Sequence, residues 1–355
     1  MAPVHDIGLQ RPLPSGFGTV FTDHMFLANY NRRLGWHDPR IVDRGPLPLD
    51  PAATVLHYGQ AVFDGLKAFL GHDDILRTFR PEAHAERLNR SAERLCMPTL
   101  DKRFICASFD QLLERDRDWA PPAPAALYLR PTIVGTEPFL GVRSANEFVY
   151  FLIMSSVGDY YPNGFSPLRL LASDRFSRAA PGGLGSAKTP ANYAASLLAA
   201  HQAQAEGFDQ VLWLDAVHHR YLDEVGMMNI MVQIADEIIT PPLSDTILAG
   251  VTRDSCLAIM RDWGLKVSER PIAIDEIIAA GNDGSLKEVW GTGTAAIVAP
   301  IGEIAFRDHR VTIGGGRIGP MTQRLYNAVR QLQYGLAPDA RGWLRDVRAA
   351  TATAP

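Results

Sequence analysis

Lys188 is the residue whose chemistry the sequence brings out most clearly. It lies in a run of glycines and small residues, 181–193 (PGGLGSAKTPANY), and the Gly- and Pro-free segment 192–206 predicts a helix behind it. A glycine-rich backbone lets a bulky group approach closely. A lysine in an apolar, water-poor pocket loses part of its proton affinity and can form a Schiff base with an aldehyde. Lys188 is therefore a candidate nucleophilic amine, and the alternative is a solvated lysine on a surface loop.

Two glycine motifs invite a nucleotide-binding interpretation. Residues 182–189 miss the phosphate-loop pattern of ATPases at Ala187, and the apolar strand predicted at 168–172 ends too far upstream. Residues 314–319 satisfy the G-x-G-x-x-G pattern, but too little chain follows them for a complete βαβ unit. We therefore favour the Schiff-base interpretation over an ATPase or a dinucleotide-binding protein.

Three charged residues lie where a charge needs a reason. Glu224 is followed by small residues and a very apolar run, so it is either a solvated loop residue or the buried partner of a cation. Arg130 interrupts the strand predicted at 127–134, where a charge requires a partner. Arg87 belongs to a Pro-initiated amphipathic helix expected over 81–95, and it faces either solvent or an anion.

Two turns offer hydrogen-bond donors to an anion. The stretch 248–253 (LAGVTR) opens a helix expected over 253–263, where free backbone N–H groups suit a phosphate and Thr252 can cap the helix. The stretch 290–296 (WGTGTAA) follows a short strand expected at 287–289. It offers hydroxyl and backbone donors, and a plain tight turn is the alternative.

The elements that must position these residues fall into two groups. Further strands are predicted over residues 17–29, 148–157, 168–173 and 210–215, and a last helix over 321–334. Turn residues concentrate between the second and third of these strands, in the stretch GDYYPNGFSP. We therefore predict two domains, 1–157 and 169–355, joined by an interdomain loop at 158–168.

The composition is that of a two-domain protein of ordinary charge. The 355 residues are 46% hydrophobic, and the net charge of -4 includes no basic stripe for nucleic acid. Cys96, Cys106 and Cys256 are odd in number and far apart, so we expect core thiols without disulfides. His218 and His219 are neighbours that point apart, so no metal site is expected. No signal-peptide pattern or membrane-spanning run is present, which favours a cytoplasmic protein.

Together, in their order and spacing over nearly the whole chain, these motifs resemble the branched-chain amino acid aminotransferases of fold type IV, a group of pyridoxal phosphate enzymes. Besides the lysine stretch, the most specific motifs are LHYGQAVFDGLKAF, RPEAHAERLNRSAERL, LYLRPTIVGTEPFLGV, VGDYYPNG, LDEVGMMNI, LAGVTRDS and GTGTAA. The resemblance implies an α/β (α+β) fold with a smaller N-terminal α/β domain and a larger C-terminal pseudo-barrel domain carrying the lysine. It also implies a homodimer with active sites at the interface, and no nucleic-acid or membrane partner.

The resemblance further implies pyridoxal 5'-phosphate as the cofactor. Lys188 would form the internal aldimine and then move the proton between the substrate Cα and the cofactor. Glu224 would pair with the pyridine nitrogen so that the ring can absorb the carbanion's electrons, and Tyr193 would hydrogen-bond the ring hydroxyl. The residues implied to hold the phosphate are Arg87, Val251, Thr252 and Thr292.

The substrate site is implied in the same way. The backbone N–H groups of Thr294 and Ala295 would bind the α-carboxylate, and Arg130 would help the pocket to accept the second carboxylate of glutamate. Leu140 and Val142 would reach the pocket of the neighbouring subunit. The residues implied to wall the apolar pocket are Phe17, Tyr58, Phe63, Tyr128 and Tyr160.

Two positions depart from relatives. Met227 stands where relatives commonly carry a smaller residue such as Thr or Ala, so we expect a narrower or more apolar substrate pocket. Ala296 and Ala299 occupy the places of a Cys-x-x-Cys redox pair found in mammalian relatives, so we expect no thiol regulation of that form.

The activity implied is the reversible transfer of the amino group of L-leucine, L-isoleucine or L-valine to 2-oxoglutarate. The products are the branched-chain 2-oxo acid and L-glutamate, in a ping-pong cycle. Two alternatives share the fold, namely a D-amino-acid aminotransferase and an aminodeoxychorismate-type lyase, which releases pyruvate without a keto-acid acceptor. A third alternative is a catalytically silent protein that binds pyridoxal phosphate.

Overall fold

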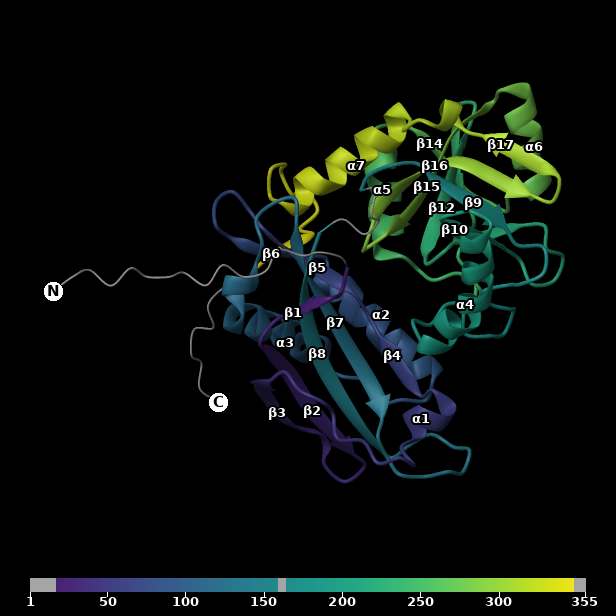
Figure 1. The fold of residues 1–355 in the computed structure, drawn as a ribbon. Coiled ribbons are helices and arrows are strands. Elements are labelled where there is room, and N and C mark those ends of the chain that lie inside the picture. The colour runs from purple at the N-terminus through teal and green to yellow at the C-terminus, as the bar shows by residue number, and fades with distance from the viewer. Residues whose placement is uncertain (1–16, 159–163, 348–355) are drawn as a thin grey trace.

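The computed structural model describes residues 17–158 and 164–347, which form two nine-stranded sheets with helices packed against each (Figure 1). In the first sheet the strands run in the order β18-β6-β5-β7-β8-β2-β3, with β1 beside β8 and β4 beside β7, and all pairs are antiparallel. Its strands are β1 (Val20–Phe21), β2 (His24–Asn31), β3 (Gly35–Asp43), β4 (Ala61–Phe63), β5 (Leu66–Leu70), β6 (Leu76–Phe79), β7 (Ala126–Gly135), β8 (Glu147–Val157) and β18 (Leu344–Asp346).

Three helices and one short 3-10 turn belong to this first part of the chain. They are α1 (Thr54–Tyr58), α2 (Pro81–Arg94), α3 (Lys102–Arg115) and the turn Arg117–Trp119. Helix α2 begins with Pro81, whose fixed φ suits a first helical residue, and buries one apolar face through Ala85, Leu88 and Ala92. Those side chains share a core with β5, β7 and β8, so the helix is anchored to the sheet.

The second sheet closes on itself. Its main order is β11-β10-β9-β16-β15-β12-β13-β14, and an additional pairing of β11 with β12 joins six of the strands into a ring. Its strands are β9 (Leu168–Ala172), β10 (Gln210–Leu214), β11 (Leu222–Val225), β12 (Met228–Ile234), β13 (Glu237–Thr240), β14 (Lys266–Glu269), β15 (Leu286–Gly293), β16 (Ile297–Phe306) and β17 (His309–Thr312). This ring confirms the expected pseudo-barrel, and the two parts together confirm the α+β fold class.

Four helices surround the ring. They are α4 (Pro190–Ala205), α5 (Val251–Asp262), α6 (Ile274–Asp283) and α7 (Pro320–Gln333), with a 3-10 turn at Gly314–Gly316. Trp290 on β15 and Leu325 on α7 are fully buried in one core that also takes the apolar face of α5. In Figure 1 helix α7 crosses from the ring toward the first sheet, where β18 pairs with β6.

Most predicted elements are present, with shifts at their ends. The strand expected over 17–29 is two strands, β1 and β2. Helix α5 begins at Val251, so Thr252 is a first-turn residue and not the expected cap. The stretch 290–296 is not all turn, because β15 continues to Gly293. Glu224 is not in a loop, since it lies inside the buried strand β11.

The proposed domain boundary at 158–168 falls between β8 and β9, the strands that end one sheet's contribution and begin the other's. One segment departs from the proposed division: residues 344–346 return to the first sheet as β18. Cys106 and Cys256 are buried free thiols as expected, but Cys96 is exposed. In the described part of the chain, no helix is long and apolar enough to cross a membrane, and no cluster of His, Cys, Asp and Glu could hold a metal ion.

Candidate active site

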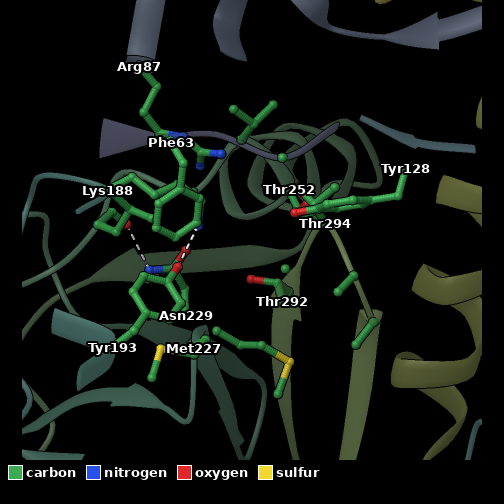
Figure 2. A pocket seen from close by; sticks show the side chains of 18 of the residues that line it. Phe63, Arg87, Tyr128, Lys188, Tyr193, Met227, Asn229, Thr252, Thr292 and Thr294 are labelled. Carbon is green, nitrogen blue, oxygen red and sulfur yellow. Dashed lines mark hydrogen bonds between the residues drawn. The ribbon is translucent and has the colours of Figure 1, made fainter. Parts of the chain in front are cut away.

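A cavity of about 290 Å³ lies between the two sheets and contains Lys188 (Figure 2). Strands β4, β5 and β7 contribute residues from one side, and the start of α5 and the end of β15 contribute from the other. The expected site residues that line it are Phe17, Phe63, Arg87, Tyr128, Arg130, Lys188, Tyr193, Met227, Val251, Thr252, Thr292, Thr294 and Ala295.

The Lys188 side chain is held against two aromatic rings. Its Nζ donates a hydrogen bond of 2.7 Å to the Tyr193 hydroxyl and lies 5.1 Å from the centre of the Phe63 ring. The side chain keeps some exposure because it lines the cavity, yet the surrounding protein displaces most of the water that would solvate an ammonium. This desolvation, with the nearby Arg87 cation, lowers the pKa of Lys188 to about 8. Burial also raises the pKa of Tyr193 to about 12.

The loop before Lys188 is fixed on several sides. The Lys188 N–H donates to Ser91 Oγ on α2, and the Lys188 carbonyl accepts from the Phe63 N–H. Asn192, in the first turn of α4, donates to the Leu184 and Ala187 carbonyls. These bonds cross from the loop to both parts of the molecule, so the lysine is positioned by the fold and not by the loop alone.

Arg87 lines the cavity with a guanidinium that is already paired. Its Nε and Nη2 donate to the two oxygens of Asp64 at 2.8 Å each, and His84 Nδ1 lies 2.8 Å from Asp64 Oδ1. Burial alone would raise the pKa of Asp64, but Arg87 and His84 outweigh it and hold that pKa well below its usual range. Arg87 Nη1 is left as the part of the fork without an acidic partner among the described residues.

Donors for an anion gather on the other side of the cavity from Lys188, where Thr252, Thr292 and Thr294 lie (Figure 2). The first turn of α5 supplies free backbone N–H groups at Val251 and Thr252. Thr292 is 1% exposed, and its hydroxyl has no hydrogen-bond partner within the described chain. A buried hydroxyl without a partner costs free energy, so this wall of the cavity fits a phosphate group.

Glu224 lies behind the cavity wall and does not line it. One carboxylate oxygen accepts hydrogen bonds from the Leu248 N–H at 2.8 Å and from Asn229 Nδ2 at 3.2 Å. The other forms an ion pair with Arg178 Nε at 3.1 Å. Burial raises the pKa of Glu224, and Arg178 opposes that rise. Leu248 and Asn229 themselves line the cavity, so the carboxylate is one residue removed from it.

The remaining walls are aromatic and apolar. Phe17 packs edge-on against Tyr128 with the ring centres 4.8 Å apart. Arg130 Nη2 donates to the Tyr128 hydroxyl at 2.9 Å, and the guanidinium lies 4.6 Å from the centre of the Phe63 ring. Position 65 must be glycine here, because a Cβ would overlap the Tyr128 hydroxyl.

Three expected pocket residues are not in this cavity, and a fourth lies outside the described residues. Tyr58, Leu140 and Val142 are 45%, 62% and 88% exposed, and the Tyr58 hydroxyl donates to the Leu140 carbonyl. The expectation that Tyr58 walls the pocket of its own chain is therefore corrected, because α1 holds it on the surface. Tyr160 falls within 159–163, which the structure does not describe.

Sequence reasoning missed four residues that hold the site. Asp64 and His84 orient Arg87, while Arg178 and Asn229 hold Glu224. Asn229 could have been found, because the tight turn at Gly226 places it opposite Glu224 in the antiparallel pair of β11 and β12. No sequence signal marks the other three, since their partners are distant in sequence.

Comparisons with known proteins agree with the geometry and confirm the resemblance. Residues 61–304 match the family described as Amino-transferase class IV. The chain is 48% identical over 344 residues to branched-chain-amino-acid aminotransferase 2 of Bacillus subtilis (strain 168), covering 96% of this chain and 95% of that protein. It is 45% identical to branched-chain-amino-acid transaminase 1 of the same strain, covering 95% and 96%.

Solved structures show the same architecture. The branched-chain aminotransferase of the archaeon Thermoproteus uzoniensis with norvaline aligns with a TM-score of 0.77 and 25% identity, covering 92% of this chain and 100% of that chain. A bacterial-type relative solved with pyridoxamine 5'-phosphate, also described as a branched-chain amino acid aminotransferase, aligns with a TM-score of 0.78 and 26% identity, covering 93% and 100%.

Proposed function

This chain belongs to the class IV aminotransferases, and we propose that within this family it is a branched-chain-amino-acid aminotransferase that uses pyridoxal 5'-phosphate. It transfers the amino group of L-leucine, L-isoleucine or L-valine to 2-oxoglutarate. The observation that carries the proposal is Lys188, a desolvated amine hydrogen-bonded to Tyr193 in a cavity that opposes aromatic walls to a set of phosphate donors.

The residues present fit the cofactor. Thr292 has a buried hydroxyl that is unpaired within the described chain, and the start of α5 and Arg87 Nη1 complete a cradle for its phosphate. Lys188 would bind its aldehyde, Tyr193 its ring hydroxyl and Glu224 its pyridine nitrogen. When bound, the cofactor supplies an electron sink that stabilises negative charge at the substrate Cα.

Lys188 then moves the proton at the substrate Cα. A pKa of about 8 leaves an appreciable share of the amine neutral near physiological pH, so it can accept that proton and return it. Tyr193 keeps its own proton over the same range and orients the amine. Arg178 favours the ionised form of Glu224, which keeps a negative charge behind the ring.

The walls select the substrate. Phe17, Phe63 and Tyr128 offer an apolar surface to a branched side chain, and Met227 fills part of the floor. The N–H groups of Thr294 and Ala295 bind the α-carboxylate. Arg130, held over Phe63 with its Nε buried and unpaired within the described chain, provides a cation for the second carboxylate of glutamate.

The protein would act as a homodimer. Tyr58, Leu140 and Val142 form an exposed apolar cluster, held together by the bond from the Tyr58 hydroxyl to the Leu140 carbonyl. In a dimer this cluster would complete the pocket of the partner subunit. A cytoplasmic location stays a prediction, which cell fractionation would check.

The decisive experiment follows the visible absorbance of the cofactor-loaded protein. L-Leucine should convert it to the pyridoxamine form, and 2-oxoglutarate should restore it. The matched variant Lys188→Ala should show neither change and almost no turnover. Conversion by D-leucine alone, release of pyruvate without an acceptor, or a spectrum that leucine leaves unchanged would each contradict the proposal.

A further inference from the structure

A buried lysine outside the cavity holds the turn that closes it. Lys67 lies on β5, is 7% exposed, and donates a hydrogen bond of 2.7 Å from Nζ to the Ala295 carbonyl. The two residues are 228 positions apart. Lys67 belongs to the first sheet, and Ala295 lies in the turn between β15 and β16 of the second. One ammonium therefore joins the two halves of the molecule at the proposed carboxylate site.

The peptide unit between Ala295 and Ala296 separates two cavities. Both residues line the cavity that contains Lys188, and both line a smaller cavity on which Lys67 also opens. This peptide bond is trans, so its C=O and N–H point in opposite directions. Because the carbonyl is directed at Lys67, the Ala296 N–H is directed away from Lys67, toward the Lys188 cavity.

The backbone next to this peptide is strained. Ile297 has a φ of 65°, a value that β-branched residues rarely adopt. Such a conformation persists only where the surroundings hold it in place. Ile297 is 7% exposed and packs in a core with Met231 and Trp290, which holds the turn from the barrel side. Lys67 holds it from the other side, so the turn is fixed by contacts from both sheets.

We propose that Lys67 is a positioning residue for the substrate carboxylate. By binding the Ala295 carbonyl, it fixes the 294–296 turn so that its N–H groups, including that of Ala296, face the cavity. The cation on the carbonyl also polarises the peptide and strengthens its N–H as a donor. This inference rests on the proposed function, since it assumes that a substrate carboxylate binds at this turn.

Lys67 does not act by contacting the substrate. It is absent from the lining of the Lys188 cavity, and the peptide that it binds lies between them. A lysine that only joined the two sheets would affect every ligand of the cavity equally. A lysine that orients N–H donors affects ligands with a carboxylate selectively, and this difference makes the idea testable.

The test compares a charged and a neutral leucine analogue. Binding of 4-methylpentanoate and 4-methylpentanamide to the cofactor-loaded protein is measured by titration calorimetry in the parent and in Lys67→Met. We expect the Kd of the carboxylate to rise about tenfold, the effect of weakening a charge-assisted hydrogen bond, and that of the amide to change less than about twofold. The KM for leucine should rise more than kcat falls, and the cofactor content should not change.

Two variants serve as controls. Lys67→Arg keeps a cationic donor and should restore the carboxylate Kd to within about threefold of the parent. Lys102→Met removes an exposed lysine that pairs with Glu86 and should change neither Kd. If Lys67→Met does not fold, Lys67→Gln repeats the comparison with a donor but no charge.

Equal losses for both analogues, or no loss for the carboxylate, would overturn the role of Lys67 while leaving the proposed function intact. A parent protein that transaminates no branched-chain amino acid would instead overturn the proposed function.

Discussion

At the scale of single residues, the cavity shifts two neighbouring groups in opposite directions. Burial lowers the pKa of Lys188 to about 8 and raises that of Tyr193 to about 12. The ammonium is the form that burial disfavours in lysine, and the phenolate is the form that it disfavours in tyrosine. Near neutral pH the pair therefore holds a protonated tyrosine beside an amine that is close to losing its proton, as an acid-base catalyst requires.

The first prediction concerns Lys188→Met in the cofactor-free protein. The pKa of Lys188 is about 8 when folded and near 10.5 when unfolded, so between these values the unfolded chain binds more protons and parent stability rises with pH. Below pH 8 the buried ammonium lowers stability by a constant amount. We expect the variant to be more stable than the parent by about 1–2 kcal/mol near pH 7, since the lost hydrogen bond offsets part of the gain.

Thermal melting of both proteins between about pH 7 and 9.5 checks this, because the difference should shrink as the pH rises. A difference that is constant with pH would contradict the lowered pKa.

The second prediction concerns Thr292→Val. The Thr292 hydroxyl is buried and unpaired within the described chain, so its removal should stabilise the cofactor-free protein by about 1 kcal/mol. The same change removes a phosphate donor and should weaken pyridoxal phosphate binding about tenfold. Melting curves and cofactor titrations measure the two effects, which have opposite signs.

Thr240→Val is the matched control for this pair of effects. Thr240 is equally buried, but its hydroxyl donates to the Ile230 carbonyl at 2.7 Å. The control should lose stability and keep its cofactor affinity. Unchanged cofactor affinity in Thr292→Val would exclude its hydroxyl from the phosphate site.

At the scale of elements, the loop before α4 is placed by close backbone contact. A Cβ at position 185 would overlap the Thr246 backbone, which a folded protein cannot accommodate without movement. Arg178 and Asn192 bind carbonyls on either side of this contact. The loop is therefore a fixed support for Lys188, although its composition is that of a flexible segment.

The third prediction concerns Gly185→Ala. The added methyl group should displace the loop, lower the free energy of unfolding by about 1–3 kcal/mol and reduce turnover. Urea unfolding and steady-state rates measure both effects. Gly45→Ala is the control, because a Cβ there meets nothing within 4 Å and its φ is not positive. Equal behaviour of the two variants would show that the contact with Thr246 does not constrain the loop.

At the scale of the whole molecule, the site lies where two sheets meet, and several of its bonds cross between them. Lys67 reaches Ala295, Arg94 donates to the Gly182 and Gly183 carbonyls, and Thr189 donates to the Ala61 carbonyl. A change in the placement of the two halves would alter the cavity from both sides. The exposed cluster on α1 and the loop at 138–143 adds a third contributor once a second subunit is present.

The fourth prediction concerns this cluster in the intact enzyme. The double change Leu140→Asp and Val142→Asp places charges on an apolar surface that a dimer would bury, so the protein should become monomeric and lose most of its turnover. Sedimentation velocity measures the assembly. Leu336→Asp is a matched control on another exposed apolar residue, after α7, and should keep both properties. An active monomer would contradict the shared pocket.

The sequence alone determined the order of the elements and the identity of the central lysine. Helix α2, strands β7 and β8 and helix α7 follow from apolar periodicity and from a proline at each helix start, which are local properties. The motif around Lys188 is likewise local, since its glycines and its lysine are adjacent in the chain.

Only the tertiary structure decided which charges meet and how strongly the protein desolvates them. Arg87 pairs with Asp64, Glu224 with Arg178, and Lys67 with a carbonyl 228 residues away. These contacts arise where the ring of the second sheet closes and the first sheet packs beside it, and no sequence period encodes such long-range pairs. The lowered pKa of Lys188 belongs with them, because burial by residues from both halves removes the water that a free lysine would keep.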